Sequence, residues 1–99
     1  MTEKHVDQEF VENIVKALVQ NPEKVTTERT IDERGVLITL HCDPSDVAIV
    51  IGRKGQTIKA IRTLLRSLGA KRKAILNLKV IEPNNRRQNN ETLSTDIEL

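Results

Sequence analysis

Two glycines, Gly52 and Gly55, stand three positions apart between two apolar helical patterns, and they enclose the basic pair Arg53-Lys54. Glycine accepts positive φ and has no side chain to hold a ligand away from the backbone. Gly55 also opens the second helix, whose unpaired N–H groups and dipole favour an anion. The sequence therefore predicts two helices joined by a tight loop that can hold a phosphate.

Apolar periodicity divides the rest of the chain into helices and strands. The predicted helices span 6–19, 44–51 and the stretch from the loop to Gly69, and the predicted strands span 25–31, 36–42 and 74–81. Asp32–Gly35 is expected to form a hairpin turn, and Asp43 to cap the helix that begins at Pro44. The predicted order is helix, strand, strand, helix, loop, helix, strand.

Charge is distributed unevenly along the 99 residues, although the net charge is only +2. Residues 1–42 carry five basic and eight acidic side chains, residues 43–82 nine and three, and residues 83–99 two and three, giving balances of −3, +6 and −1. The positive segment contains the glycine loop, as expected if that loop faces a polyanion. Lys59, Arg62 and Arg66 make one face of the following helix basic, while Lys71-Arg72-Lys73 is open to two interpretations, a solubilising turn or a second nucleic-acid contact.

The residues offer little for catalysis or metal binding. The loop does not match G-x-x-x-x-G-K-[ST] or G-x-G-x-x-G, and His5 and His41 have no partners for a triad or a metal site. Asp43 and Asp46 are interpreted as helix-start residues, and Cys42 as a small buried apolar residue. We expect no enzyme, no catalytic residue, no metal, no cofactor and no small-molecule substrate.

Phe10 is the only aromatic residue, which argues against folds that stack bases on exposed aromatic side chains. The pattern V-I-G-x-x-G-x-x-I-x-x-I at residues 50–61 instead resembles the core of KH RNA-binding domains. The element order resembles the type II arrangement of that family, which implies an α+β fold with a three-stranded mixed sheet packed against three helices. The KH domain would cover residues 1–82, and the polar tail at 83–99 is expected to be disordered.

The resemblance implies single-stranded RNA as the ligand. Backbone N–H groups between Gly52 and Gln56, with the side chains of Arg53, Lys54 and Lys59, would hold phosphates, and an apolar groove would receive about four bases. The RNA-binding residues expected on this basis are Val50, Ile51, Gly52, Arg53, Lys54, Gly55, Gln56, Ile58 and Lys59.

A short chain with one type II KH domain is similar to small bacterial single-KH proteins. This resemblance implies a cytoplasmic RNA chaperone or post-transcriptional regulator, not bound to membranes, that influences cell length and peptidoglycan homeostasis. It would form a homodimer or pair with a second, larger KH protein. Two alternatives stay open: a KH-fold dimerisation module without RNA binding, and a DNA-binding helix-turn-helix protein.

Overall fold

Three helices and three strands follow one another in the predicted order in the computed structural model, which describes residues 5–82. The elements are α1 (Val6–Leu18), β1 (Thr26–Asp32), β2 (Gly35–His41), α2 (Val47–Ile51), α3 (Gln56–Arg72) and β3 (Leu76–Val80). Short 3₁₀ turns at Pro22–Lys24, Pro44–Asp46 and Arg53–Gly55 connect them. The expected polar tail at 83–99 lies outside the described residues.

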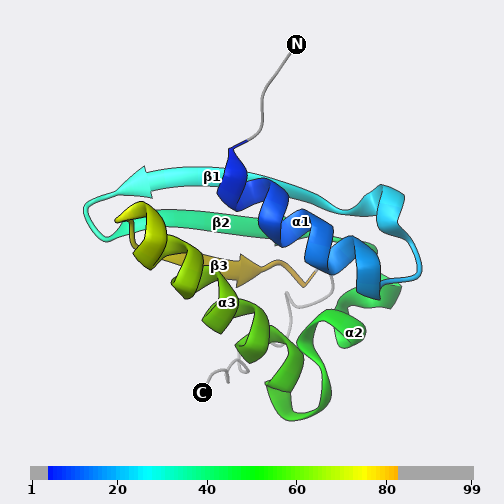
Figure 1. Cartoon of the computed structure of the whole chain (residues 1–99). Helices are drawn as coiled ribbons and strands as arrows, with labels where there is room; N and C mark the ends of the chain where they lie inside the picture. Colours follow the sequence, from blue (N-terminus) through cyan, green and yellow to red (C-terminus); the bar gives the residue numbers. More distant parts are fainter. Residues whose placement is uncertain (1–4, 83–99) are drawn as a thin grey trace.

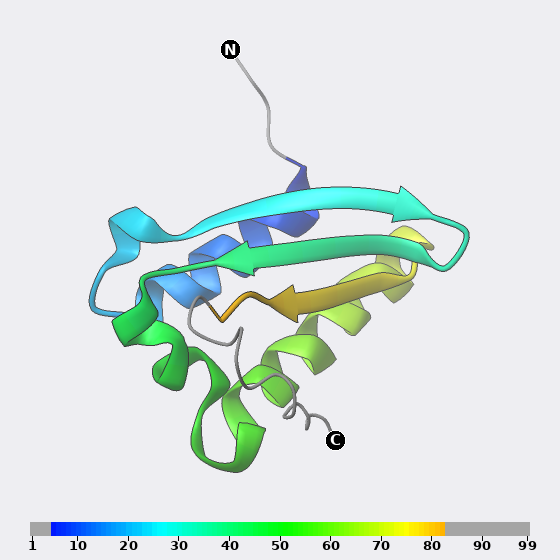
Figure 2. The same cartoon turned by 180° about the vertical axis from the view of Figure 1, so that it is seen from behind.

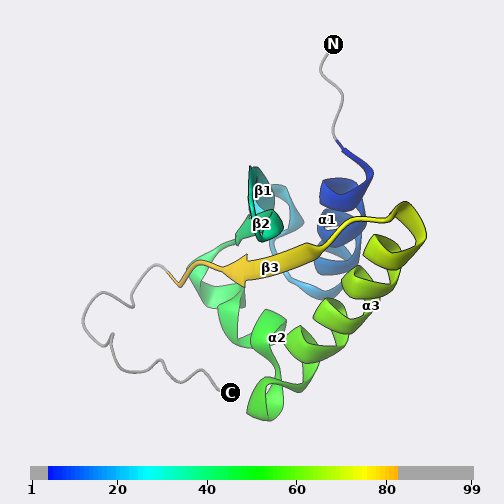
Figure 3. The same ribbon diagram turned by 90° about the vertical axis from the view of Figure 1, so that its left-hand side faces the viewer.

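The sheet has the strand order β1-β2-β3, so β2 is central. β1 pairs with β2 antiparallel, with Thr26 opposite His41, and β2 pairs with β3 parallel, with Val36 opposite Leu76. The three helices cover one face of this sheet (Figures 1 and 3), and the view from behind shows that no helix of the described residues covers the other face (Figure 2). The expected α+β fold, a mixed three-stranded sheet packed against three helices, is confirmed.

The core lies between the sheet and the helices. Alternate residues of β2 point into it, as the period-two pattern predicts, and Ile38 and Leu40 are completely buried. The helices contribute the other large group of buried apolar side chains, which are Val11, Val15, Val50, Ile58, Ile61 and Leu65. Within residues 5–82, no helix is both long and apolar enough to cross a bilayer.

The end of α3 differs from the prediction, because Gly69 does not stop the helix. The helix continues to Arg72, and Lys73 ends it with a left-handed φ of 59°. Gly69 is buried where α3 passes the start of the last strand, and a Cβ there would lie 2.5 Å from the Ala74 carbonyl oxygen. This glycine therefore serves close packing rather than helix termination, and Lys71 and Arg72 belong to the last helical turn.

The strand boundaries differ from the prediction by one or two residues. β1 begins at Thr26 and ends at Asp32, and β3 is shorter than the predicted 74–81. The expected hairpin turn is present, and the backbone N–H of Arg34 donates to the Asp32 carboxylate at 2.8 Å. Ile31, at the end of β1, remains 67% exposed because α1 does not cover that corner.

Two buried carboxylates on α1, which periodicity did not reveal, join this helix to β1. Asp7 accepts from Nε of Arg29 at 3.1 and 3.2 Å, and Glu12 accepts from the Thr27 hydroxyl at 2.6 Å. Both carboxylates are more than nine-tenths buried. A buried charge is tolerated only where it is paired and hydrogen-bonded, so these contacts determine where α1 lies on the sheet.

Candidate nucleic-acid interface

The segment that leads into the glycine loop is fixed by two aspartates with different partners. Asp43 caps as predicted, accepting hydrogen bonds from the backbone N–H and the hydroxyl of Ser45. Asp46, expected only to be a helix-start residue, is completely buried and accepts from the backbone N–H groups of Gln20 and Asn21 at 3.2 and 3.0 Å. The Asn21 side-chain amide adds a third hydrogen bond at 3.1 Å. Asp46 thus ties the end of α1 to the start of α2.

The loop itself depends on its backbone conformation. Gly52 has φ 79° and ψ 171°, and Gly55 has φ 75° and ψ 16°. A Cβ on Gly52 would overlap the Thr57 hydroxyl and lie 2.6 Å from the Thr57 Cβ, whereas the nearest atoms around Gly55 are 4.0 Å away. Gly52 is therefore required by both space and φ, and Gly55 by φ alone. Lys54 also has a positive φ, 56°, which the sequence did not predict.

Several backbone donors of the loop are already used within the protein. The N–H of Gly52 donates to Ala48, that of Gly55 to Gly52 and that of Gln56 to Arg53. The amides of Arg53 and Lys54 have no such acceptor among residues 5–82. Of the backbone N–H groups between Gly52 and Gln56 that are expected to hold phosphates, those of Arg53 and Lys54 at the tip are therefore the available donors.

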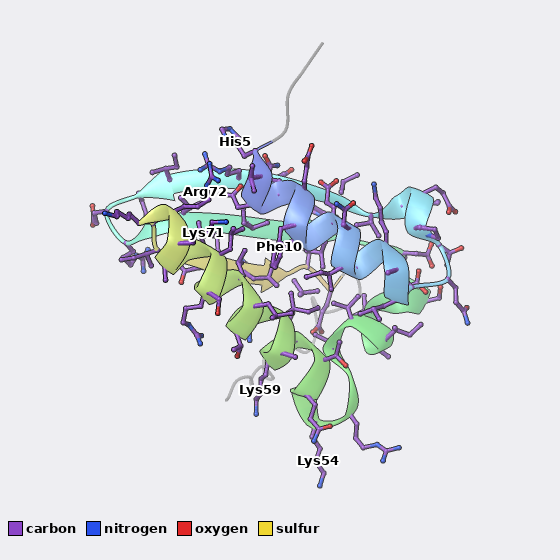
Figure 4. The ribbon with its side chains drawn as sticks, viewed as in Figure 1. His5, Phe10, Lys54, Lys59, Lys71 and Arg72 are labelled. Carbon is purple, nitrogen blue, oxygen red and sulfur yellow. The ribbon has the colours of Figure 1, made fainter. Side chains whose placement is uncertain are left out.

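The basic side chains stand at the exposed tip of the loop and just beyond it. Arg53, Lys54 and Lys59 are exposed, and none forms an ion pair within the described part of the chain. Figure 4 shows Lys54 extending away from the loop, with Lys59 on the same end of α3, and Lys71 and Arg72 at the opposite end. The loop thus presents uncompensated positive charge to solvent.

The three apolar residues expected to line a groove have unequal access to the surface. Val50 is fully buried and Ile58 is 5% exposed, whereas Ile51 is half-buried. Val50 and Ile58 pack α2 and α3 together beneath the loop. Val50 as it stands cannot touch a base, which corrects its expected role, and a groove contact remains a prediction for Ile51.

Comparison of the sequence with models of protein families identifies the family of this chain. A sequence model described as "KhpA/KhpB, KH domain" matches residues 8–80, which include all the elements described above except the first two residues of α1. The chain belongs to this family. The resemblance to KH domains inferred from the glycine loop is confirmed.

Curated relatives of this KH family carry the name "RNA-binding protein KhpA". The protein of Mycobacterium leprae is 38% identical over 61 residues, covering 62% of this chain and 76% of that protein. The protein of Caldanaerobacter subterraneus is 36% identical over 73 residues, with coverages of 74% and 97%, and that of Chlamydia pneumoniae 35% identical over 74 residues, with coverages of 75% and 95%.

Arg62 has a position in this KH domain that helix periodicity alone could not give. Its Nε donates to the Leu78 carbonyl oxygen at 3.3 Å, so the side chain reaches from α3 to β3. β3 is an edge strand, with β2 on one side only. The contact shows that the flank of α3 carrying Arg62 borders this edge.

Cys42 lies beside the aspartates that begin α2, and it is 8% exposed. Burial raises the pKa of the Cys42 thiol, and the carboxylates of Asp46 and Asp43 raise it further. Within residues 5–82 no group of three or more metal-ligating side chains gathers around it or elsewhere. Its environment is the opposite of the electropositive, accessible setting of a reactive thiol.

We therefore expect Cys42 in the folded protein to react with iodoacetamide at pH 8 at least roughly tenfold more slowly than in urea, because attack needs an accessible thiolate. The raised pKa also predicts that stability attributable to the thiol is complete below the unfolded-state pKa of about 8.5 and is lost as pH rises toward the folded value. Mass spectrometry of timed samples measures the alkylation rate. Equal rates in buffer and urea would contradict the burial of this side chain.

Proposed function

We propose that this protein binds single-stranded RNA through the loop formed by Gly52, Arg53, Lys54 and Gly55. The observation that carries the proposal is an exposed Arg-Lys pair that forms no ion pair within residues 5–82, on a loop whose shape is determined by two glycines. The name of the relatives, RNA-binding protein, supports the same ligand. KH domains grip the backbone of about four nucleotides with this kind of loop.

In the proposed complex, the side chains of Arg53 and Lys54 and their two free amides hold consecutive phosphates. Lys59, one turn into α3 on the same end of the molecule, adds a further positive charge. Bases then lie beside the half-buried Ile51, with Val50 and Ile58 supporting the loop from below. Since backbone contacts carry no sequence information, we expect modest sequence preference.

The cellular role we propose is that of an RNA chaperone or post-transcriptional regulator acting with KhpB, with effects on cell length and peptidoglycan homeostasis. The family that matches the chain includes both KhpA and KhpB. A homodimer or a heterodimer with a KhpB-like protein is part of the proposal. Apolar side chains left exposed on α1 and α3, Leu18 at 45% and Leu64 at 49%, are compatible with such an assembly.

The test of the loop is the variant Arg53→Asp/Lys54→Asp, titrated with a short single-stranded RNA at several salt concentrations. Aspartate tolerates the left-handed conformation found at position 54, so the substitution suits the backbone. Removing one phosphate contact lowers the slope of log affinity against log salt by roughly 0.7. We expect the slope to fall by about 1.4, together with much weaker binding.

A matched control is Lys24→Asp/Arg34→Asp, which makes the same change of charge at exposed positions before β1 and in the β1–β2 turn. This control should retain RNA binding. Circular dichroism verifies that all three proteins are folded. If the loop variant binds RNA as tightly as the unchanged protein, the loop is not the RNA site. If the unchanged protein is folded and binds no RNA, a dimerisation module is favoured.

A further inference from the structure

The outer surface of the helical layer carries a strip of apolar side chains that the core covers only in part. α1 and α3 contact each other on the same face of the sheet (Figure 1), and Figure 4 shows Phe10 between them. Leu18 and Leu64 are 45% and 49% exposed. The other members of the strip pack against the core and stay half-buried. The apolar seam is defined as Phe10, Ile14, Leu18, Leu64 and Leu68.

The apolar seam contains no charged residue, although 30% of the residues in the chain are charged. Along its middle, the exposed helix positions three or four residues away are also uncharged and small or polar. They are Asn13, Ala17, Ala60 and Ser67. A surface patch that lacks charges is typical of the centre of a protein–protein interface. The small side chains beside the seam allow a second backbone to come close.

The apolar seam lies away from the residues proposed to bind RNA. Leu64 and Leu68 each follow a basic residue, Arg62 and Arg66, by two positions. Two positions are more than half a turn of an α-helix, so the seam and these cations are on opposite sides of α3. A partner on the seam therefore leaves the glycine loop free.

We propose that the apolar seam is the surface through which two copies of this chain form a symmetric dimer, with α1 of one copy antiparallel to α1 of the other. The inference rests on the homodimer in the proposed function and assigns its interface. RNA binding by the loop does not depend on it.

A second copy fits because the seam is complementary to itself. Phe10 and Leu18 are each four positions from Ile14. A two-fold axis beside Ile14 therefore packs Phe10 of one copy against Leu18 of the other, in the reciprocal way that such symmetry requires. Glu9 and Lys16, both exposed and about two turns apart on α1, border this contact. The antiparallel arrangement brings Glu9 of each copy toward Lys16 of the other, whereas a parallel one opposes like charges.

The experiment measures the mass of the full-length protein and of Leu18→Gln/Leu64→Gln by sedimentation equilibrium. Because α1 is only about 20 Å long, the shared face is at the small end of interface sizes, so we expect association at micromolar concentrations. The unchanged protein should shift from monomer to dimer between about 1 and 500 µM. Loss of four leucine side chains from the dimer should raise its dissociation constant at least roughly 30-fold.

The matched control, Ile31→Thr/Ile75→Thr, removes two other exposed apolar side chains and keeps residues suited to strands. It should dimerise like the unchanged protein. Thermal melting followed by circular dichroism verifies the fold of each variant. If the unchanged protein is monomeric at every concentration, the dimer is wrong. If it dimerises and the seam variant does so equally well, or the control is weakened as much as the seam variant, the homodimer stands and the assigned surface is wrong.

Two further measurements test the orientation and separate the dimer from RNA binding. Glu9→Lys should weaken dimerisation at low salt and have less effect at about 1 M salt, where charges are screened. Unchanged or tighter association at low salt would overturn the antiparallel arrangement. A four-nucleotide oligouridylate should bind the seam variant and the unchanged protein equally per chain, whereas Arg53→Asp/Lys54→Asp should lose RNA and still dimerise. Reduced RNA binding by a folded seam variant would contradict the separation of the two surfaces.

Discussion

Asp46→Ala should lower the free energy of unfolding by about 3–5 kcal/mol, because it removes the acceptor of three hydrogen bonds, and each buried donor left unsatisfied costs about 1–3 kcal/mol. The donors of Gln20 and Asn21 would be left without their acceptor where α1 meets α2. A domain of this size has a total stability of roughly 5–15 kcal/mol, so the loss would be a large part of it. Urea denaturation followed by circular dichroism measures the change.

Two further aspartate variants test whether the lost hydrogen bonds, rather than the loss of a negative charge in general, cause the decrease in stability. Asp43→Ala, which loses an exposed cap, should destabilise much less, since water can replace the missing acceptor. Asp46→Asn keeps the shape and one acceptor oxygen but turns an NH₂ group toward the donors, so its stability should fall between those of wild type and Asp46→Ala. If Asp43→Ala cost as much as Asp46→Ala, the three hydrogen bonds would not be the reason.

Gly52→Ala should destabilise the domain by about 3 kcal/mol or more and disrupt the loop. The new methyl group would overlap the side chain of Thr57, and the backbone at φ 79° and ψ 171° lies in a region that is essentially restricted to glycine. Strain of this kind costs about 1–3 kcal/mol, and overpacking typically adds 1–3 kcal/mol. Denaturation measures the first effect, and RNA titration at a temperature where the variant is folded measures the second.

Gly55→Ala is the comparison for Gly52→Ala. Its Cβ would lie 4.0 Å from the nearest atoms, an ordinary contact distance, so only the left-handed φ opposes the substitution, at about 1–2 kcal/mol. Gly55→Asn should cost less still, since asparagine visits that conformation readily. Similar decreases in stability at positions 52 and 55 would show that contact with Thr57 does not determine the requirement for glycine at 52.

The order of elements and the loop could be predicted because their signals are local. Alternating apolar residues marked β2, the cap at Asp43 depends on Ser45 two residues later, and the glycine spacing located the loop. These features involve neighbours within one helical turn or one strand. Periodicity and turn chemistry were therefore sufficient to predict the fold class and the family.

The errors came from contacts between segments distant in the sequence. Gly69 looked like a helix stop because its role depends on how α3 packs against the residues that follow it, and Asp46 looked like a simple helix-start residue because its partners lie 25 and 26 positions earlier. Val50 carries the family motif, yet only the packed structure shows that it has no exposed surface. Such residues have the right type for several roles, and tertiary packing selects one.

The parallel pairing of β2 with β3 also determines when the loop can form. Val36 and Leu76 are partners although forty positions separate them, and α2, the loop and α3 all lie between the two strands. Bringing the two strands together reduces the conformational entropy of this long segment before the pairing contacts can stabilise the chain, and this slows folding. During synthesis, at about 5–20 residues per second, the ribosome must release β3 before the sheet can close. A nascent chain from which Arg53 and Lys54 have already emerged would therefore still lack the closed sheet that positions these side chains.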